Sequence, residues 1–268
     1  MMIKTLLIKI LGRLGYEIIA SSRNAPINMS QHLQSLFEKF GIDCVLDVGA
    51  NIGQYADFLR NQIGYNGLII SFEPINEHIS LLNEKSENDP KWHVYGFALG
   101  AENTEKPINV MRASALSSFL EPDHSNTNLF SLYNRIHHRQ TVNMKTLDSI
   151  IDKLKAKHQV KKIFLKLDTQ GYDFQVILGA ERTLAVVLAI QIELSVQSIY
   201  SGMPTYYDVL KEMHKRGYDL SGMFSNSQDS LLRLIEFDCI LINRCVAEGA
   251  DIRAMRVPGL VSGPLLSD

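Results

Sequence analysis

The chain has 268 residues, with 27 Lys and Arg against 29 Asp and Glu, a formal net charge of −2, and 46% hydrophobic residues. These proportions are typical of a soluble globular protein with one large α/β domain or two small ones, and they exclude a disordered, collagen-like or disulfide-rich chain. A near-neutral charge balance provides no broad basic surface for non-specific nucleic-acid binding. We therefore expect no nucleic-acid partner.

The first 19 residues combine an apolar stripe at helical spacing with three basic residues. The stripe consists of Ile3, Leu7, Ile10, Leu11 and Leu14. Such a helix usually packs on its own domain or on a partner, and the alternative is weak contact with an anionic membrane surface. No stretch reaches the ~20 uninterrupted apolar residues of a membrane span, and the three cysteines show no C-x-x-C spacing. The expected location is cytoplasmic, with or without peripheral membrane contact.

From Ile42 onward, apolar runs of strand length alternate with amphipathic segments of helix length. This alternation is typical of a parallel sheet built from βαβ units. The predicted strands cover residues 44–48, 68–72, 92–99, 163–168 and 189–194. The predicted helices cover residues 54–61, 76–83, 173–178 and 205–216.

Two further stretches do not follow this alternation. The apolar runs 231–237 and 239–243 are too close for a helical crossover, so they predict either a hairpin or one bent strand. Residues 102–140 show little periodicity and many polar side chains. We expect them to form a long excursion without core elements, and long excursions in compact domains are often lids.

Residues 45–54 read V-L-D-V-G-A-N-I-G-Q, an apolar strand followed by a glycine-bearing turn that opens a helix. Such a turn lets the backbone approach a ligand closely and points helix N–H groups at it, as in doubly wound folds that hold nucleotide-type cofactors. Gly49 and Gly53 meet these demands, and Asn51 between them tolerates a positive φ. An ordinary tight turn with a capping acid is the alternative.

An acid also follows the second predicted strand, in S-F-E-P at 71–74. A carboxylate at Glu73 can accept both hydroxyls of a ribose, so this spacing indicates an adenosine cofactor. The turn lacks the second glycine of the dinucleotide pattern G-x-G-x-x-G and carries Asp47 two residues before its first glycine. A carboxylate there would repel a pyrophosphate, but it suits a sulfonium cofactor that carries an α-amino group.

Several stretches, in order, resemble the FkbM-type S-adenosylmethionine-dependent methyltransferases. They are LDVGANIGQY at 46–55, SFEP at 71–74, FALG at 97–100, SSF at 117–119, TLDSI at 146–150, LKLDTQGYDFQVILGA at 165–180 and IQIELSVQSIYSGMPTYYDVL at 190–210. The first two mark class I methyltransferases broadly, whereas TLD followed by the LKLD stretch is more particular to the family. Many members carry Asp-Val-Glu-Gly where this chain has Asp-Thr-Gln-Gly at 168–171, so it lacks a carboxylate at position 170.

The resemblance implies a class I methyltransferase fold, which is a Rossmann-like, doubly wound α/β architecture with a mostly parallel seven-stranded sheet and an antiparallel last strand. The resemblance covers about residues 42–246. Because no internal repeat or low-complexity linker occurs, we expect one methyltransferase domain over 41–248, preceded by an N-terminal helical extension (1–40) and followed by a C-terminal tail (249–268). The resemblance also implies S-adenosylmethionine as cofactor and an O-methyltransferase that acts on a hydroxyl of a small molecule or glycan. The expected cofactor-binding residues are Asp47, Gly49, Ala50, Asn51, Gly53, Glu73, Pro74, Ala98, Leu99 and Asp168.

Two residues are candidates for the general base. Asp168 follows the predicted strand 163–168, where reacting groups gather in an open α/β sheet. Lys166 should point to the same face, so Asp168 is a candidate base, a ligand for the cofactor's amino group, or a structural partner of Lys166. His138, beside His137 on the excursion, is the second candidate because histidine is the usual proton acceptor at neutral pH. A solvated loop position is the alternative for His138.

Four residues are expected to contact the substrate: Ser117, Ser118, Glu193 and Tyr200. No metal is expected, because no spacing such as H-E-x-x-H or a calcium loop occurs. Two rival functions remain open. A nicotinamide-dependent oxidoreductase would share the acid at Glu73 but requires the missing glycine pattern, and a non-catalytic protein could keep the cofactor pocket without turnover.

Overall fold

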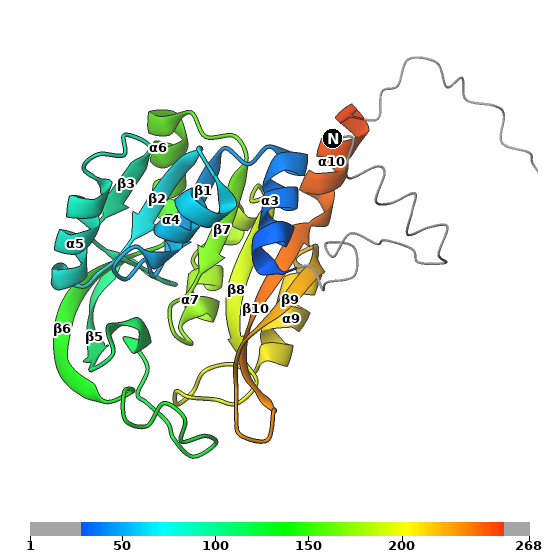
Figure 1. Cartoon of the computed structure of the whole chain (residues 1–268). Coiled ribbons are helices and arrows are strands. Elements are labelled where there is room, and N and C mark those ends of the chain that lie inside the picture. Colours follow the sequence, from blue (N-terminus) through cyan, green and yellow to red (C-terminus); the bar gives the residue numbers. More distant parts are fainter. Residues whose placement is uncertain (1–27, 255–268) are drawn as a thin grey trace, which may run out of the picture.

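The structure is a computed structural model and describes residues 28–254. Its centre is a seven-stranded sheet with the order β3-β2-β1-β7-β8-β10-β9 (Figure 1). In that order the strands are Trp92–Tyr95, Leu68–Phe72, Cys44–Val48, Ile163–Leu167, Ala189–Ser195, Leu234–Asn243 and Tyr218–Gln228. All pairings from β3 to β8 are parallel, and β10 is antiparallel to both of its neighbours. The mostly parallel sheet with an antiparallel last strand is therefore confirmed.

Helices cover both faces of this sheet because successive strand residues point to opposite sides. In β1, Cys44, Leu46 and Val48 pack in one apolar cluster and Val45 packs in another. The first face is covered by α6 (Leu147–His158), α7 (Asp173–Leu178), α8 (Glu181–Leu184) and α9 (Tyr206–Lys215). The second is covered by α3 (Met29–Phe40), α4 (Gln54–Phe58), the π-helix η1 (Leu59–Ile63) and α5 (Asn76–Ser86). The fold is doubly wound, as the sequence predicts.

Two predicted strand assignments need correction or refinement. Residues 92–99 do not form one strand, because the chain leaves the large sheet after β3 and passes through Gly96 and Phe97 to β4 (Ala98–Leu99). Residues 234–237 and 239–243 of the two apolar runs belong to one strand, β10, whereas residues 231–233 precede it in a turn. Its hairpin partner is β9, which the sequence did not predict as a strand. Only Tyr218 of β9 is fully buried, so this edge strand has no continuous apolar pattern.

The prediction that residues 102–140 contain no core element is wrong. They contribute β5 (Thr104–Met111), a short 3-10 helix, η2 (Ser114–Leu116), and the start of β6 (Ile136–Lys145). These strands and β4 form a second sheet with the order β4-β6-β5. Ile108, Val110 and Val142 bury one face of it in their own apolar cluster. Polar residues alternate with them along both strands, which conceals the strands in the sequence.

The predicted extension and tail lie only partly within the described residues. The amphipathic helix predicted in residues 1–19 lies outside the described residues, as does segment 255–268. Within the extension, α3 buries Leu33, Leu36, Phe37 and Phe40 against the sheet. The chain leaves the sheet through α10 (Arg244–Ala254) (Figure 1). None of the helices within residues 28–254 has the length and apolar composition that a membrane crossing requires.

Candidate active site

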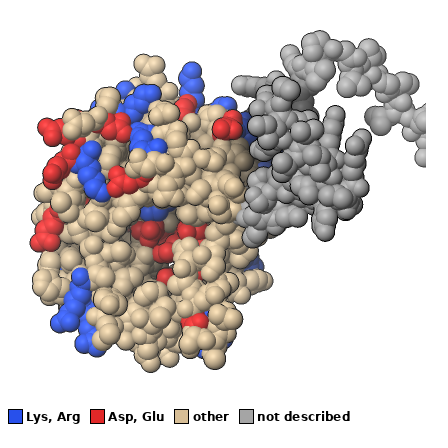
Figure 2. Space-filling model, viewed as in Figure 1, with Lys and Arg blue, Asp and Glu red and all other residues tan. Residues whose placement is uncertain are grey.

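A cavity of about 290 Å³ opens where β1, β2 and β7 end, and its wall continues along β8. Figure 2 shows acidic side chains on the floor of a hollow in the middle of this face. Ile108, Ser117 and Phe119 line the cavity from the segment that includes the small sheet. The predicted site residues that line it are Gly49, Ala50, Asn51, Glu73, Pro74, Ala98, Leu99, Ser117, Asp168 and Glu193.

The turn after β1 adopts the backbone conformation that its sequence predicts. Gly49 has φ +80, and a Cβ there would overlap the backbone carbonyl oxygen of Asp168. The positive φ expected at Asn51 is confirmed, with a value of 47°. Gly53 has φ +88 and caps α4. A Cβ on Gly53 would meet the ring of Trp92 at 2.8 Å, so this glycine serves helix packing rather than the cavity surface.

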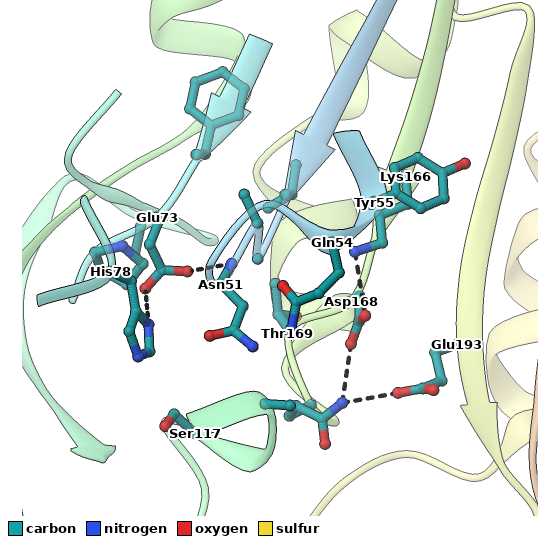
Figure 3. Close-up of a pocket in the computed structure, with 18 of the residues that line it drawn as sticks. Asn51, Gln54, Tyr55, Glu73, His78, Ser117, Lys166, Asp168, Thr169 and Glu193 are labelled. Carbon is teal, nitrogen blue, oxygen red and sulfur yellow. Dashed lines mark hydrogen bonds and ion pairs between the residues drawn. The ribbon is translucent and has the colours of Figure 1, made fainter. Parts of the chain in front are cut away.

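Glu73 holds the turn after β1 to the turn after β2. Its Oε2 accepts a hydrogen bond from the backbone N–H of Asn51 at 2.8 Å, and its Oε1 accepts one from the N–H of Ile75 at 2.9 Å. His78 of α5 places Nδ1 3.3 Å from the same Oε1 (Figure 3). Glu73 is only 4% exposed, yet it lines the cavity. Its carboxylate is therefore fixed in position before any ligand binds.

Asn51 supplies a buried acceptor to the same end of the cavity. Its Oδ1 is inaccessible to solvent and has no hydrogen-bond partner within the described part of the chain. Buried polar atoms are normally satisfied, so an unpaired acceptor in a cavity wall indicates a ligand that donates a hydrogen bond. The turn therefore suits a ligand with amino or hydroxyl groups.

Lys166 joins two carboxylates below the cavity. Register places Asp47 of β1 opposite Lys166 of β7, and the Lys166 Nζ lies 3.3 Å from Asp47 Oδ1 and 3.1 Å from Asp168 Oδ2. The predicted proximity of Lys166 and Asp168 is confirmed. Burial lowers the pKa of Lys166, but the Asp168 and Asp47 charges outweigh it and the net pKa is raised. Burial raises the pKa of Asp47, and Lys166 opposes that shift.

A second carboxylate group lies along β8 and β10. Asp238 is directly opposite Glu193 in the antiparallel register, and Glu236 is two residues away on β10. Burial, followed by the charges of Asp168, Glu236 and Asp238, raises the pKa of Glu193. Burial also raises the pKa of Glu236, to about 7. Like charges placed across neighbouring strands disfavour joint ionisation, so protons bind more tightly here than to isolated carboxylates.

Gln170 connects the two carboxylate groups. Its Nε2 donates to Asp168 Oδ1 at 2.9 Å and to Glu193 Oε2 at 2.8 Å; both bonds are drawn in Figure 3. On its other side, Glu193 Oε1 accepts a hydrogen bond from Asn226 Nδ2 at 2.9 Å. The carboxylates of Asp168 and Glu193 therefore face the same cavity with one amide between them.

Five predicted site residues do not line the cavity: Asp47, Gly53, Ser118, His138 and Tyr200. The Asp47 side chain is fully buried beneath the cavity, where it faces Lys166. Ser118 and Tyr200 are each 1% exposed and contact Gln170 instead. His138 lies in β6 opposite Val110, and its Nδ1 is 2.9 Å from Nδ1 of His137.

The cavity also includes polar side chains that the sequence did not assign to the site. They are Gln54, Tyr55, His78, Ser114, Lys166, Thr169, Gln170, Gln191 and Asp238. Gln191 lies two residues before Glu193 on β8, so strand alternation could have placed it on the same face. Its Nε2 donates to Asp238 Oδ1 at 2.9 Å, and its Oε1 accepts from the Tyr55 hydroxyl at 2.7 Å. Within residues 28–254, no three His, Cys, Asp or Glu side chains are arranged so that they could hold a metal ion.

The sheet order, the antiparallel β10 and the cavity beyond the glycine turn define an α/β protein with the class I methyltransferase fold. Residues 47–220 match the model of the methyltransferase FkbM domain, and this match covers more than half of the chain. The chain belongs to this family. Among curated proteins, none is significantly similar in sequence.

Similar solved structures include a SAM-dependent methyltransferase from Aquifex aeolicus, with 13% identity and a TM-score of 0.40. That similarity covers 81% of this chain and 90% of the other. The magnesium protoporphyrin IX methyltransferase from Synechocystis, solved with bound SAM, is 8% identical with a TM-score of 0.42, covering 82% of this chain and 86% of that one.

Proposed function

We propose that this chain is an S-adenosylmethionine-dependent O-methyltransferase that acts on a hydroxyl of a small molecule or glycan. Family membership supports the reaction class. The observation that carries the choice of oxygen is the pair of carboxylates, Asp168 and Glu193, held at one cavity by a shared amide. An alcohol reacts poorly unless a base removes its proton, and a positioned carboxylate can do this. The near-neutral charge balance supports a small acceptor over a nucleic acid.

The residues at the glycine turn support S-adenosylmethionine as the cofactor. Gly49 allows close approach of the backbone, and the unpaired Asn51 Oδ1 can accept from an α-amino group. Glu73 accepts two backbone hydrogen bonds and has further lone pairs for ribose hydroxyls. Ala98 and Leu99 offer an apolar surface to the adenine. When bound, the cofactor supplies an electrophilic methyl group on its sulfonium.

Among the carboxylates, Glu193 is the better candidate for the base. Asp168 is ion-paired with Lys166 at 3.1 Å, and a neighbouring cation weakens a carboxylate as a base. Glu193 has no ion-pair partner within the described residues, and burial raises its pKa. In this role Glu193 takes up the hydroxyl proton, while Asp168 orients the acceptor or the cofactor's amino group. His138 would need to reach the cavity from β6 to take part.

The proposal is tested by calorimetric titration of the chain with S-adenosylhomocysteine and, in a parallel cell, with NAD. One-to-one binding of S-adenosylhomocysteine alone supports the proposed cofactor. Binding of NAD alone would instead favour an oxidoreductase, and no binding of either would favour a cofactor-free role.

The choice of base needs a transfer assay. Hydroxylated small molecules and glycans are screened with S-adenosylmethionine that carries a labelled methyl group. Glu193→Gln should keep S-adenosylhomocysteine binding and lose transfer at least about 100-fold, the lower end of the effect of a general base. Asp168→Asn provides the comparison between the two carboxylates. Full transfer by Glu193→Gln would exclude Glu193 as the base.

A further inference from the structure

Gln170 lies between the carboxylates of Asp168 and Glu193. Its Nε2 donates to Asp168 Oδ1 at 2.9 Å and to Glu193 Oε2 at 2.8 Å. Ionised carboxylates only accept hydrogen bonds, so the NH₂ end of the amide must face both of them. One NH₂ group therefore links a side chain that directly follows β7 to a side chain of the neighbouring strand β8; the two hydrogen bonds are dashed lines in Figure 3.

The surrounding chain fixes Gln170 in a conformation that few residues adopt. Its φ is 54°, in the left-handed region, and Gly171 follows with φ 83°. The Ser118 hydroxyl donates to the backbone oxygen of Gln170 at 2.7 Å. The Tyr200 hydroxyl lies 2.9 Å from Gln170 Oε1 and 2.7 Å from the backbone oxygen of Leu116, so its single proton serves these two acceptors. Ser118 therefore holds the backbone of Gln170, and Tyr200 holds the oxygen end of its side-chain amide.

The electrostatic surroundings of Glu193 make this amide important. Asp168 on the β7 side and Glu236 and Asp238 on β10 all raise the pKa of Glu193, in addition to burial. No cation of the described residues lies within ion-pair distance of Glu193, and its hydrogen-bond donors are the neutral amides of Asn226 and Gln170. A donor to a carboxylate stabilises its ionised form. Gln170 therefore opposes the protonation that burial and like charges favour.

We propose that Gln170 is a positioning residue, whose amide keeps the Glu193 carboxylate ionised and directed into the cavity beside Asp168. The inference rests on the proposed function, in which Glu193 accepts the proton of the acceptor hydroxyl. It assigns Ser118 and Tyr200 to the support of Gln170. It also means that a carboxylate at position 170 would add a third negative charge at the same place.

The test measures the ionisation of Glu193 directly, so it needs no methyl acceptor. The full chain is labelled with ¹³C at glutamate carboxyl carbons and titrated by NMR, and Glu193→Gln identifies the Glu193 signal by its loss. Gln170→Leu should move the Glu193 midpoint upward by about one pH unit, because the carboxylate loses a hydrogen bond. Gln170→Glu should move it further, since it replaces the donor with a charge. Gln175→Leu is the matched control, because the Gln175 side chain in α7 makes no hydrogen bond to these carboxylates.

A second variant protects the test against misfolding at position 170. Tyr200→Phe keeps the ring and removes one hydrogen bond to Gln170 Oε1, so it should shift Glu193 in the same direction by less. An unchanged Glu193 midpoint in Gln170→Leu and Tyr200→Phe would overturn the inference. Binding of S-adenosylhomocysteine, measured on the same samples, reports the proposed function separately. If the wild-type chain binds S-adenosylhomocysteine but the variants show no shift of the Glu193 midpoint, the proposed function stands and only the role of Gln170 is refuted.

Discussion

Replacement of Glu73 by alanine should affect both stability and cofactor binding, and the structure allows the two effects to be separated. Glu73→Ala removes the acceptor of two backbone N–H groups, the buried one of Ile75 and the partly buried one of Asn51. Each unsatisfied buried donor costs about 1–3 kcal/mol, so the free energy of unfolding should fall by about 2–6 kcal/mol. Glu73→Gln keeps one acceptor oxygen and should lose about half as much. Loss of the ribose acceptors should also weaken S-adenosylhomocysteine binding about 100-fold or more.

The unfolding measurement has a suitable internal probe. Trp92 is the only tryptophan of the chain; it is 6% exposed and its indole N–H donates to Ser71 Oγ at 3.0 Å. Urea unfolding followed by its fluorescence gives the free energy of each variant. Glu84→Ala, an exposed carboxylate of α5, is the control and should stay within about 0.5 kcal/mol of wild type. A Glu73→Ala variant as stable as that control would refute the structural role, and unchanged affinity would refute the ribose assignment.

Three further predictions concern residues at or near the carboxyl ends of β1 and β7. Gly49→Ala should lower the free energy of unfolding by more than Gly64→Ala. Both glycines have a positive φ, but only at position 49 would the added Cβ overlap the backbone of another residue, Asp168. Urea unfolding of both variants measures the difference. Lys166→Met should cost about 3–5 kcal/mol in the same assay by leaving Asp47 unpaired, and adding Asp47→Asn should restore most of it. Burial raises the pKa of Asp173 from 3.8 to about 6, so the folded state binds a proton at Asp173 more tightly than the unfolded state does. The free energy of unfolding should therefore fall as the pH rises from about 4 to about 6. Asp173→Asn should remove this pH dependence in the same urea assay.

Local pattern was enough to predict the elements that form the centre of the fold. Strands β1 and β2 have the predicted bounds because each is a mostly apolar, buried stretch between turn residues. Helix α7 has them because its apolar residues recur at helical spacing and Gly179 follows it. Strand β9 was missed, since it is an edge strand whose side chains are mostly exposed. What makes it a strand is backbone pairing with β10, and partners that are distant in sequence leave no local signal.

The site divides in the same way between local and long-range information. The residues that follow β1, β2 and β7 reach the cavity as predicted, because the carboxyl ends of parallel strands share one edge of a sheet. Asp238 was missed because it reaches the cavity only through the register of β10 against β8. Tyr200 looked like a loop residue available to substrate, but its ring is buried and its hydroxyl contacts Gln170.

Strand register also determines which carboxylate is suited to proton transfer. The local sequence around β7 shows only one acid beside Lys166, namely Asp168, and so indicates a simple pair of one ammonium and one carboxylate. Register adds Asp47 to that pair, so one ammonium compensates two carboxylates. The same sheet places Asp238 opposite Glu193. Asp238 accepts a hydrogen bond from the Gln191 amide, and neither acid forms an ion pair within residues 28–254, although the charge of Lys166 lowers the pKa of Asp238. Because a base gains strength where a negative charge is poorly compensated, we expect proton uptake on the β8 side of the cavity and charge pairing on the β7 side.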